Sequence, residues 1–495
     1  MSAGEDEIEL KFLCEPADLS AVLAAAPEGE TQEKSLVSTY FDTPQGDLRK
    51  ARISLRIREG GGNKVQTLKR GDGFAREEYE QAVSGKGLDL TIKALKDALT
   101  PAKRKTLAPV FTVRVVRRQR TFDFGGSTIE MAVDEGEVQA GPRAKRISEV
   151  ELELKAGDCQ GMFDLARELF KTAPLYLSFD GKASQGQGLI DGSDRAPRRH
   201  DKAPLAQGLT AGQAFQAIAR NALNQIAANG VVLREADSVE AVHQLRVAVR
   251  RLRSAISTFK KVVDDKAAEE INRELKWLAR ACDEARDLDV FAEANARLAD
   301  PTLDLSALAP LVEAARARGH AKACAAVASG RFRDLVLETT AWVETGDWLT
   351  GGGKSAARRR DLPAAQFAAK ALDRRRKAVM KRGQDISGRD DEVRHEARIA
   401  AKKLRYGAEA FAPLFDPALS RDFIKTLKRL QDHLGDLNDA AVAAELVERL
   451  ELRGPALDAA RQLLAVRQAQ KSRTIRAAAK AMEKVAAAPA FWVVA

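Results

Sequence analysis

The sequence predicts a multidomain α+β protein, in which an N-terminal antiparallel β-barrel of about eight strands with flanking helices precedes an all-α domain. Three observations predict this architecture. Between residues 7 and 155, short segments alternate charged and apolar side chains with the period of two that a β-strand requires. Beyond about residue 208 the apolar period becomes helical, and Ala, Leu, Arg and Glu dominate. Within that second part, one stretch recurs at an offset of 152 residues.

The first predicted strand is the run Glu7-Ile8-Glu9-Leu10-Lys11. Successive side chains on a strand point to opposite faces, so Glu7, Glu9 and Lys11 share one face, and Ile8 and Leu10 share the other. This alternation is also typical of an exposed sheet with a solvated polar face. A closed barrel with a charged interior is the alternative, and the later strands distinguish the two.

Seven further segments repeat the alternation, with two helices predicted between them. The strands are expected at 36–41, 52–58, 65–69, 78–83, 110–124, 128–134 and 149–155, and the helices at 16–26 and 88–104. Gly- and Asn-containing turns at 42–46 and 60–63 separate the early strands. Acidic side chains gather on the strands near 7, 78, 130 and 151, and basic ones on those near 56, 69 and 117. A solvated face mixes polar types at random, so this segregation favours the closed barrel. Helices would cover the apolar outer face of that barrel.

The charged faces predict a metal and phosphate site inside the barrel. Carboxylates crowded into such an interior repel one another and resist ionisation, so they imply a divalent cation. Mg²⁺ and Mn²⁺ prefer oxygen ligands and usually bring phosphate oxygens with them. Arginine and lysine side chains would hold those phosphates, arginine through bidentate contacts.

These residues resemble a known family, the CYTH domain of the triphosphate tunnel metalloenzymes. The motifs that carry the resemblance are Glu7-x-Glu9-x-Lys11, Tyr40-Phe41-Asp42-Thr43, Leu55-Arg56-Ile57-Arg58, the Lys69 strand, Glu78 with Glu80, and Glu149-Val150-Glu151-Leu152-Glu153. The resemblance covers residues 1–190, which we call the tunnel domain. It implies an eight-stranded antiparallel β tunnel that binds a triphosphate and hydrolyses it with Mg²⁺ or Mn²⁺.

The resemblance also implies roles for individual residues. Those expected to act in catalysis are Glu7, Glu9, Lys11, Glu78 and Glu80, the last two by orienting the bases or positioning water. Those expected to bind phosphate are Lys11, Arg56, Arg58, Lys69, Arg117 and Lys182. Those expected to hold the metal, or to support its ligands, are Glu7, Glu9, Glu130, Asp134, Glu151 and Glu153. One departure stands out, because the family often ends with Ser-Lys-x-x-Arg-Gly and this chain has Gln185 at the arginine position.

Charge is distributed unevenly along the chain. Residues 209–495 contain 49 Lys and Arg against 38 Asp and Glu, whereas residues 1–208 contain 32 against 33. The second part therefore has a formal charge of +11, which favours a polyanionic partner. Aromatic residues make up only 5% of the sequence and offer few surfaces for base stacking, so nucleic acid is not the expected partner.

Other features of the composition point to the cytoplasm. The N-terminus is acidic and has few apolar residues, so no signal peptide is expected, and no apolar run approaches the length of a membrane span. The four cysteines lack Cys-x-x-Cys spacing, which argues against a zinc site and against a disulfide framework. We therefore expect a cytoplasmic protein that does not associate with membranes.

Residues 191–208 are predicted to be a linker, because they are rich in Gly, Ser, Asp, Pro and Arg and have no apolar period. Residues 209–495 form the predicted helical domain, with repeats at about 209–345 and 362–495. The segment 243–259 aligns without gaps to 395–411, and Leu275–Leu278 aligns with Leu427–Leu430 at the same offset. The duplication therefore spans several helices.

Each repeat contains a basic stripe that begins with a histidine. The stripes consist of His243, Arg246, Arg250 and Arg253, and of His395, Arg398, Lys402 and Arg405. Positions i, i+3, i+7 and i+10 lie on one face of a helix, beside an apolar stripe of Val242, Leu245, Val249 and Leu252. A single such stripe is typical of a solvated helix face, but recurrence in both repeats favours a binding role.

The repeat resembles the CHAD domain, a helical domain built from two related bundles. The resemblance covers residues 209–495 and implies that the eight basic-stripe residues bind inorganic polyphosphate. His433 has Ala281 as its counterpart, so structural and binding roles stay open for it. His200 and His320 have no neighbouring motif and are expected at the surface.

The leading functional prediction is metal-dependent hydrolysis of inorganic triphosphate, or a related triphosphate, in the tunnel domain, with polyphosphate bound by the helical domain. A location at polyphosphate granules would follow. The first alternative is a non-catalytic polyphosphate-binding or granule-targeting protein, which the Gln185 departure favours. The second is an adenylate cyclase, an activity found among relatives of the tunnel family, although nothing in the sequence indicates an adenine pocket.

Overall fold

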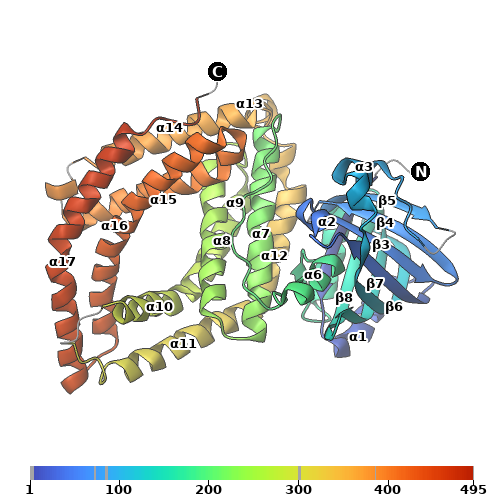
Figure 1. Cartoon of the computed structure of the whole chain (residues 1–495), viewed down its shortest axis with the longest axis horizontal. Helices are drawn as coiled ribbons and strands as arrows, with labels where there is room; N and C mark the ends of the chain where they lie inside the picture. The colour runs from blue at the N-terminus through green and yellow to red at the C-terminus, as the bar shows by residue number, and fades with distance from the viewer. Residues whose placement is uncertain are drawn as a thin grey trace. The chain divides into compact units, whose positions relative to one another are not determined.

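The computed structural model describes residues 5–71, 74–83, 87–298, 303–384, 386–388 and 390–493 (Figure 1). The chain divides into two compact units. The first unit is Met1–Pro197 with Val336–Thr345, and the second is Arg198–Leu335 with Gly346–Ala495.

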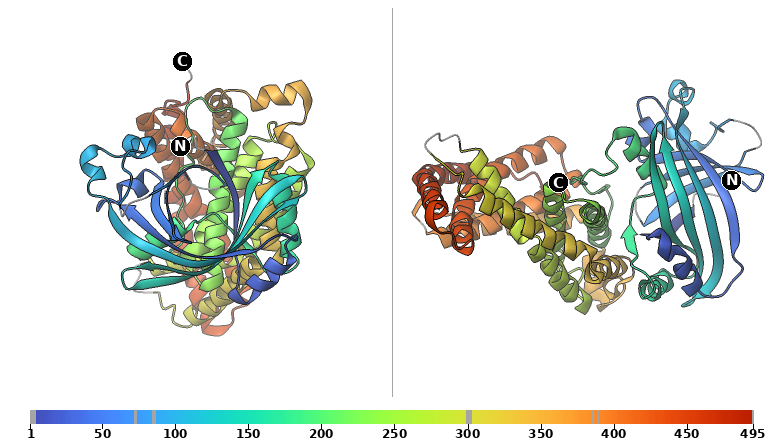
Figure 2. Two further views of the ribbon diagram at one scale, coloured as in Figure 1. Left: turned by 90° about the vertical axis from the view of Figure 1, so that its right-hand side faces the viewer. Right: turned by 90° about the horizontal axis from the view of Figure 1, so that it is seen from below.

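The first unit is built on one antiparallel sheet whose strands are β1 (Glu5–Leu13), β2 (Gln32–Asp42), β3 (Ile53–Gly60), β4 (Asn63–Arg70), β5 (Ala75–Ala82), β6 (Ala108–Phe124), β7 (Ser127–Ala140), β8 (Arg143–Ala156) and β9 (Tyr176–Ser178). Their order is β5-β4-β3-β2-β6-β7-β8-β1-β9. The start of β1, Glu5–Ile8, also pairs with Ala75–Glu78 of β5, so eight strands form a ring of pairings (Figure 2).

The predicted antiparallel β-barrel fold is thus confirmed, with one strand more than the eight expected. β9 adds to β1 through pairs such as Phe12 with Leu177, and its three residues are too few to show an alternating pattern. The outer face is apolar, as predicted. Val150 and Leu152 of β8 are fully buried there, and α5 (Gln160–Phe170) packs on β6, β7 and β8.

The remaining helices of the first unit are short. They are α1 (Leu19–Ala25), α2 (Asp47–Lys50), α3 (Lys93–Ala98), α4 (Pro101–Arg104) and α6 (Lys182–Asp191). The helix predicted at 88–104 is wrong as a single element, because it is divided into α3 and α4. Pro101 has no backbone N–H for a continuing helix, and the Thr100 hydroxyl caps the second one by accepting from Lys103 N.

The second unit is helical, which confirms the all-α prediction. Its helices are α7 (Ala211–Glu235), α8 (Val239–Thr258), α9 (Lys266–Ala281), α10 (Asp283–Ala296), α11 (Ala309–Ala328), α13 (Gly353–Arg360), α14 (Ala364–Arg382), α15 (Asp391–Phe411), α16 (Pro417–Arg449) and α17 (Gly454–Ala487), and α12 (Gly330–Thr345) belongs to both units. Side chains of Thr210, Ser238, Asp265 and Asp390 cap the first turns of α7, α8, α9 and α15. None of the described helices is both long and apolar enough to cross a membrane.

The sequence repeat reappears in the helices. An offset of 152 residues takes the start of α8 at Val239 to the start of α15 at Asp391. The same offset places α9 and α10, which meet at Cys282, onto the single helix α16. Phe259 at the end of α8 and Phe411 at the end of α15 are buried, with ring centroids 5.7 Å apart, so the two repeats share a core at this point.

Candidate functional site

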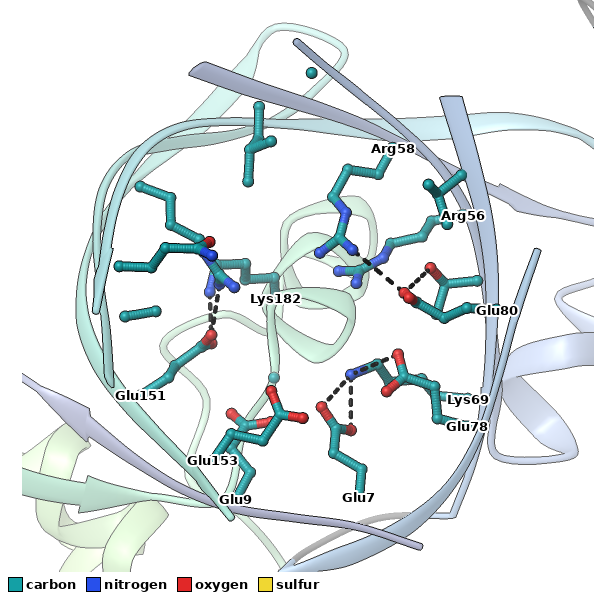
Figure 3. Close-up of a pocket in the computed structure, with 18 of the residues that line it drawn as sticks. Glu7, Glu9, Arg56, Arg58, Lys69, Glu78, Glu80, Glu151, Glu153 and Lys182 are labelled. Atoms are coloured by element: carbon teal, nitrogen blue, oxygen red, sulfur yellow. Dashed lines mark hydrogen bonds and ion pairs between the residues drawn. The ribbon is translucent and has the colours of Figure 1, made fainter. Parts of the chain in front are cut away.

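The interior of the strand ring is a cavity of about 570 Å³, lined mainly by charged side chains (Figure 3). Every tunnel residue that the sequence predicted lines it, with the exception of Asp134. These residues are Glu7, Glu9, Lys11, Arg56, Arg58, Lys69, Glu78, Glu80, Arg117, Glu130, Glu151, Glu153 and Lys182. Figure 3 shows Glu7, Glu9 and Glu153 across the cavity from Arg56 and Arg58.

Strand register places three glutamates in a line, which we call the acidic row: Glu9 on β1, Glu153 on β8 and Glu130 on β7. Glu9 lies directly opposite Glu153, and Glu153 lies directly opposite Glu130. Like charges that face each other across strands repel. Burial raises the pKa of Glu153, and the nearby Glu7 and Glu130 raise it further, although Lys155 opposes the rise.

Lysines neutralise part of this negative charge. Lys155 Nζ lies 2.6 Å from Glu153 Oε1 and 3.8 Å from Glu130 Oε1. On the other side of the row, Lys69 Nζ lies 2.6 Å from Glu7 Oε1 and 3.2 Å from a carboxylate oxygen of Glu78. Glu9 Oε1 lies 3.2 Å from Lys11 Nζ. Each carboxylate of this wall, which consists of Glu7 and the acidic row, is therefore held near a cation, while the row as a whole keeps an excess of negative charge.

The side chains of this wall are chemically suited to a divalent cation, but they are not arranged as a preformed metal site. Carboxylate oxygens are the ligands that Mg²⁺ and Mn²⁺ prefer, and a bound cation would oppose the effect of burial, and of Glu7 and Glu130, on the pKa of Glu153. Among the described residues, however, no group of three or more acidic, histidine or cysteine side chains is arranged to hold a metal ion. Ligands would have to turn away from their lysines.

A second set of charges is buried at the base of the cavity, where three cations meet three carboxylates. This buried cluster consists of Lys11, Arg117, Lys182, Asp134, Glu149 and Glu151. Lys11 Nζ lies 2.8 Å and Lys182 Nζ 2.7 Å from Glu151 Oε1. Burial alone would raise the pKa of Glu151, but Lys11, Lys182 and Arg117 outweigh it and hold that pKa well below its usual value.

Asp134 stands behind the cavity wall. It is fully buried, and it accepts hydrogen bonds from Arg117 Nε at 2.8 Å and Arg117 Nη2 at 2.6 Å. Lys182 Nζ lies 2.7 Å from Asp134 Oδ2, the oxygen that also accepts from Arg117 Nη2. Of the two roles that the resemblance implied, ligand or support, this position suits the support of cations that face the cavity.

Two arginines of β3 form the cationic wall. Arg58 Nη2 donates to Glu80 Oε1 at 3.3 Å, and the Thr67 hydroxyl donates to the same oxygen at 2.8 Å. Arg56 Nη1 donates to the Tyr40 hydroxyl at 3.4 Å, and its buried Nε has no hydrogen-bond acceptor in the described part of the chain. Burial and the neighbouring Arg56 lower the pKa of Arg58. The pair therefore presents guanidinium groups whose N–H donors are not all used within the protein, which suits phosphate.

The prediction from sequence missed two charged residues of β8. Glu149 accepts from Lys182 Nζ at 2.8 Å and from the Gln185 amide, and Lys155 touches the acidic row. Both belong to the face that already contained Glu151 and Glu153, so extending the period of two by one step in each direction finds them. Thr67, which holds Glu80, lies two residues before Lys69 and follows from the same period, and Tyr40, which holds Arg56, belongs to one of the motifs that carry the resemblance.

In the second unit, α8 and α15 pack together and bring cations from both repeats around Tyr406. The guanidinium carbons of Arg250, Arg251 and Arg405 lie 5.5, 5.7 and 5.5 Å from the centre of its ring. We call these three residues, with Arg398 and Lys402, the basic cluster. Burial, then the charges of Arg398 and Arg250, lower the pKa of Lys402 to about 7.

The basic cluster has hydrogen-bond donors without acceptors. The buried Nε atoms of four of its arginines lack a partner among the described residues: Arg250, Arg251, Arg398 and Arg405. An unpaired buried donor is costly, and a bound anion would satisfy it. The acids nearest to the cluster are Asp439, 3.9 Å from Arg398, and Glu409, which pairs with Arg251 and lies 3.5 Å from Arg405.

The other members of the predicted basic stripes point to neighbours within their own repeat. Arg246 pairs with Asp283, and Arg253 Nε donates to Asn272 at 3.0 Å. His395 Nδ1 lies 2.9 Å from Asn438 Oδ1. Burial, then Arg286, lowers the pKa of His243. The stripes thus contribute Arg250, Arg398, Lys402 and Arg405 to one cluster, and Arg251 and Tyr406 were missed because they lie off the stripes.

The expectation that His320 lies at the surface is wrong. His320 is 3% exposed, and its Nε2 lies 3.1 Å from both carboxylate oxygens of Asp289 while its Nδ1 contacts Asp237. His200 is also partly enclosed, and burial, then Arg251, lowers its pKa to about 4. Neither environment could be predicted from the sequence, because Asp289, Asp237 and Arg251 lie far from these histidines along the chain.

Comparisons with known proteins agree with this geometry. Residues 5–186 match the CYTH domain family and residues 217–448 match the CHAD domain family. An inorganic triphosphatase of Haemophilus influenzae is 33% identical over 191 residues, which cover 36% of this chain and 54% of that protein. The chain thus spans about half the length of this curated relative.

Two further relatives extend the likeness. An uncharacterized protein of Mycobacterium tuberculosis (strain CDC 1551) is 27% identical over 473 residues, covering 89% of this chain and 87% of that protein. The crystal structure of the CHAD domain from the plant Ricinus communis matches with 30% identity and a TM-score of 0.52, covering 58% of this chain and 96% of that one. The chain therefore belongs to the proteins in which an N-terminal CYTH domain is joined to a C-terminal CHAD domain.

Proposed function

We propose that the CYTH domain hydrolyses inorganic triphosphate with Mg²⁺ or Mn²⁺, and that the CHAD domain binds polyphosphate. The observation that carries the first half is the division of the cavity into two walls, with Glu7, Glu9 and Glu153 across from Arg56 and Arg58 (Figure 3). Phosphate chains need cations along their length, and a divalent cation needs oxygen ligands. The likeness to the Haemophilus influenzae triphosphatase over this domain supports the substrate class.

Each wall would have its own task. Arg56, Arg58 and Lys69 would hold phosphate oxygens, and the acidic row with Glu7 would hold the cation, which supplies charge neutralisation for the departing pyrophosphate. Hydrolysis joins the oxygen of water to the terminal phosphorus and breaks one bridging P–O bond, so phosphate and pyrophosphate leave. The water must give up a proton. Glu78, whose pKa burial raises, would accept it beside Lys69.

Inorganic triphosphate fits this lining better than a nucleotide. The one aromatic side chain of the described lining, Tyr40, stacks on Phe111 at a centroid distance of 4.5 Å, so one face of its ring is covered. Its hydroxyl is directed at Arg56. A nucleobase would therefore meet charged side chains where it needs an apolar or aromatic surface.

Phosphate release tests the proposal. Tripolyphosphate, ATP, thiamine triphosphate and long-chain polyphosphate are each supplied with Mg²⁺, with Mn²⁺ and with chelator. We expect turnover of tripolyphosphate that chelator abolishes and that Glu7→Gln/Glu9→Gln lowers at least about a hundredfold. The matched control is Glu77→Gln, an exposed residue on β5 outside the cavity lining. Turnover that survives chelator and the double substitution would refute the assignment.

For the CHAD domain, the basic cluster supports the proposal of polyphosphate binding. Its unpaired Nε donors and its position between the two repeats suit a chain of closely spaced phosphates. Arg250→Ala/Arg398→Ala should weaken binding of long-chain polyphosphate at moderate salt by at least about tenfold. Arg273→Ala, which removes an exposed arginine of α9 that pairs with Glu270, is the control. Binding of this kind would also place the protein at polyphosphate granules in the cytoplasm.

A second candidate function is a polyphosphate receptor whose tunnel barely turns over. The observation that favours it is Gln185, which stands where the resemblance expects an arginine and donates its amide to Glu149. Gln185→Arg tests it. If a missing phosphate contact limits the tunnel, this variant should hydrolyse tripolyphosphate several-fold faster than the parent. Equal rates would leave Gln185 without a role in the choice between enzyme and receptor.

A further inference from the structure

Lys155 occupies a distinctive place beside the acidic row. It is the next inward-facing residue of β8 after Glu153, and it lines the cavity. Its Nζ lies 2.6 Å from Glu153 Oε1 and 3.8 Å from Glu130 Oε1, so one ammonium group serves two members of the row. None of the roles assigned above uses it.

The other lysines that touch this wall are more enclosed than Lys155. Lys11 belongs to the buried cluster at the base of the cavity, and its side chain is 8% exposed. Lys69 bridges Glu7 and Glu78, and its side chain is 17% exposed. The Lys155 side chain is 39% exposed and ends a flexible four-carbon stem. It can therefore leave Glu153 for a new partner at a lower cost than either.

We propose that Lys155 is a positioning residue that couples cation binding in the acidic row to the arrival of the triphosphate. This inference rests on the proposed function of the tunnel. With no phosphate in the cavity, the ammonium group stays on Glu153 and Glu130 and competes with a divalent cation for the same oxygens. When a triphosphate enters, the ammonium group gains phosphate oxygens as an alternative partner and leaves both carboxylates to the cation.

The coupling has a required symmetry. If triphosphate raises the affinity for the cation by some factor, the cation raises the affinity for triphosphate by the same factor. Removing the ammonium group should therefore change three quantities together. The cation should bind more tightly without triphosphate, the triphosphate should bind less tightly without the cation, and the factor that links them should shrink.

The test measures Mn²⁺ binding to the full-length protein by electron paramagnetic resonance of the free ion, with and without imidotriphosphate, whose nitrogen bridges resist hydrolysis. Lys155→Met removes the charge and keeps the length of the side chain. The control is Lys34→Met, which removes the same charge from a lining residue that faces Arg117, two strands away from β7. Lys34 makes no ion pair with any described carboxylate.

For Lys155→Met we expect Mn²⁺ without imidotriphosphate to bind about five- to tenfold more tightly than to the parent, and the gain on adding imidotriphosphate to fall correspondingly. Lys34→Met should bind Mn²⁺ alone as the parent does. Unchanged Mn²⁺ affinity in Lys155→Met, or an equal gain in both variants, would overturn the inference. A parent that binds no Mn²⁺ even with imidotriphosphate would instead refute the proposed function of the tunnel.

Discussion

At the scale of single residues, the two glutamates that face the cavity from β5 differ in their surroundings. Burial raises the pKa of Glu78 even though Lys69 lies 3.2 Å away. The pKa of Glu80 is lowered, because the hydrogen bond from Thr67 and the charge of Arg58 outweigh its burial. Neighbouring carboxylates whose pKa values are driven apart commonly divide the work of proton transfer and charge stabilisation. Under the proposed function, Glu78 would therefore act as the base and Glu80 as the fixed anion.

This difference predicts unequal effects of substitution. Glu78→Gln should lower kcat for tripolyphosphate by about a hundredfold or more, because the water loses its proton acceptor. The acid limb of the pH–rate profile of the parent should lie above the pKa of an ordinary glutamate, since activity is lost as Glu78 becomes protonated. Rates from pH 4 to 9 check both. Glu80→Gln should act mainly on KM, and the reverse pattern would contradict the assignment.

A second residue-scale prediction concerns Lys402 in the basic cluster. Its pKa is about 7 because it is buried and faces Arg250, Arg398 and Arg405, with Asp439 as the opposing acid. Bound phosphates favour the charged ammonium form and raise the pKa of Lys402, so binding should take up a proton at pH values between about 7 and that raised pKa. The affinity for long-chain polyphosphate should therefore fall as the pH rises above 7, by up to about tenfold per pH unit.

Dissociation constants measured from pH 6.5 to 9 at constant salt check the Lys402 prediction. Lys402→Met should bind more weakly and without the slope. Lys402→Arg, which stays charged throughout, should bind tightly at every pH in this range. A parent whose affinity is flat across the range, or a slope that persists in Lys402→Arg, would show that another group takes up the proton.

The residues that could be predicted from sequence are those whose positions depend on a local pattern or on the repeat. Glu151 and Glu153 share a face because the period of two is a local property of the strand, and the prediction placed them correctly on the cavity wall. Arg250 and Lys402 were found through the repeat. The position of Arg251 depends on Tyr406, more than 150 residues away, and a stripe along one helix contains no information about such a contact.

At the scale of elements, the close approach of β6 and β7 depends on Gly136. A Cβ atom at this position would lie 2.0 Å from the carbonyl oxygen of Arg114 and 2.8 Å from Val115 Cα, both backbone atoms that cannot turn aside. Gly136→Ala should therefore lower the free energy of unfolding of the CYTH domain by about 1–3 kcal/mol. Urea denaturation checks this, with Gly87→Ala as control, since a Cβ there meets nothing within 4 Å. Equal stability of the two variants would contradict it.

His320 supports an element-scale prediction in the CHAD domain. It joins α11 to Asp289 on α10 and to Asp237 before α8, and Arg316 Nη2 lies 3.0 Å from the same Asp289. His320→Leu would leave Asp289, which is 3% exposed, without one of its partners. Loss of a partner from a buried charge costs about 3–5 kcal/mol. Asp237→Asn, at an exposed side chain, should cost under about 1 kcal/mol in the same denaturation experiment.

The elements themselves show where local patterns suffice and where they fail. The eight long strands were predictable because each buries one face, which forces alternation. The helix expected at 88–104 failed at Pro101, which starts a new helix through its fixed backbone angle. The sequence also did not predict whether the second part of each repeat forms one helix or two. The chain is broken at Cys282 between α9 and α10 and is continuous through α16, although the flanking sequences align.

At the scale of the whole molecule, the chain joins two domains that both gather cationic side chains, but in different ways. The tunnel balances cations against carboxylates within a cavity of about 570 Å³, which suits a short substrate and a metal. The basic cluster is short of acids and has unpaired donors, which suits a long polyanion held mainly by charge. Polyanion binding of the second kind weakens steeply with salt because it releases counterions.

The two sites should therefore respond separately to substitution and to salt. Arg250→Ala/Arg405→Ala should lose most of the affinity for long-chain polyphosphate and lessen its dependence on salt, yet hydrolyse tripolyphosphate at the rate of the parent. Glu9→Gln should do the opposite, abolishing turnover while the salt dependence of polyphosphate binding stays as it was. Binding and turnover measured on all three proteins between 50 and about 300 mM salt check this. If either variant impaired both activities to the same degree while remaining folded, the two domains would form one functional site, and the division of labour proposed for them would be wrong.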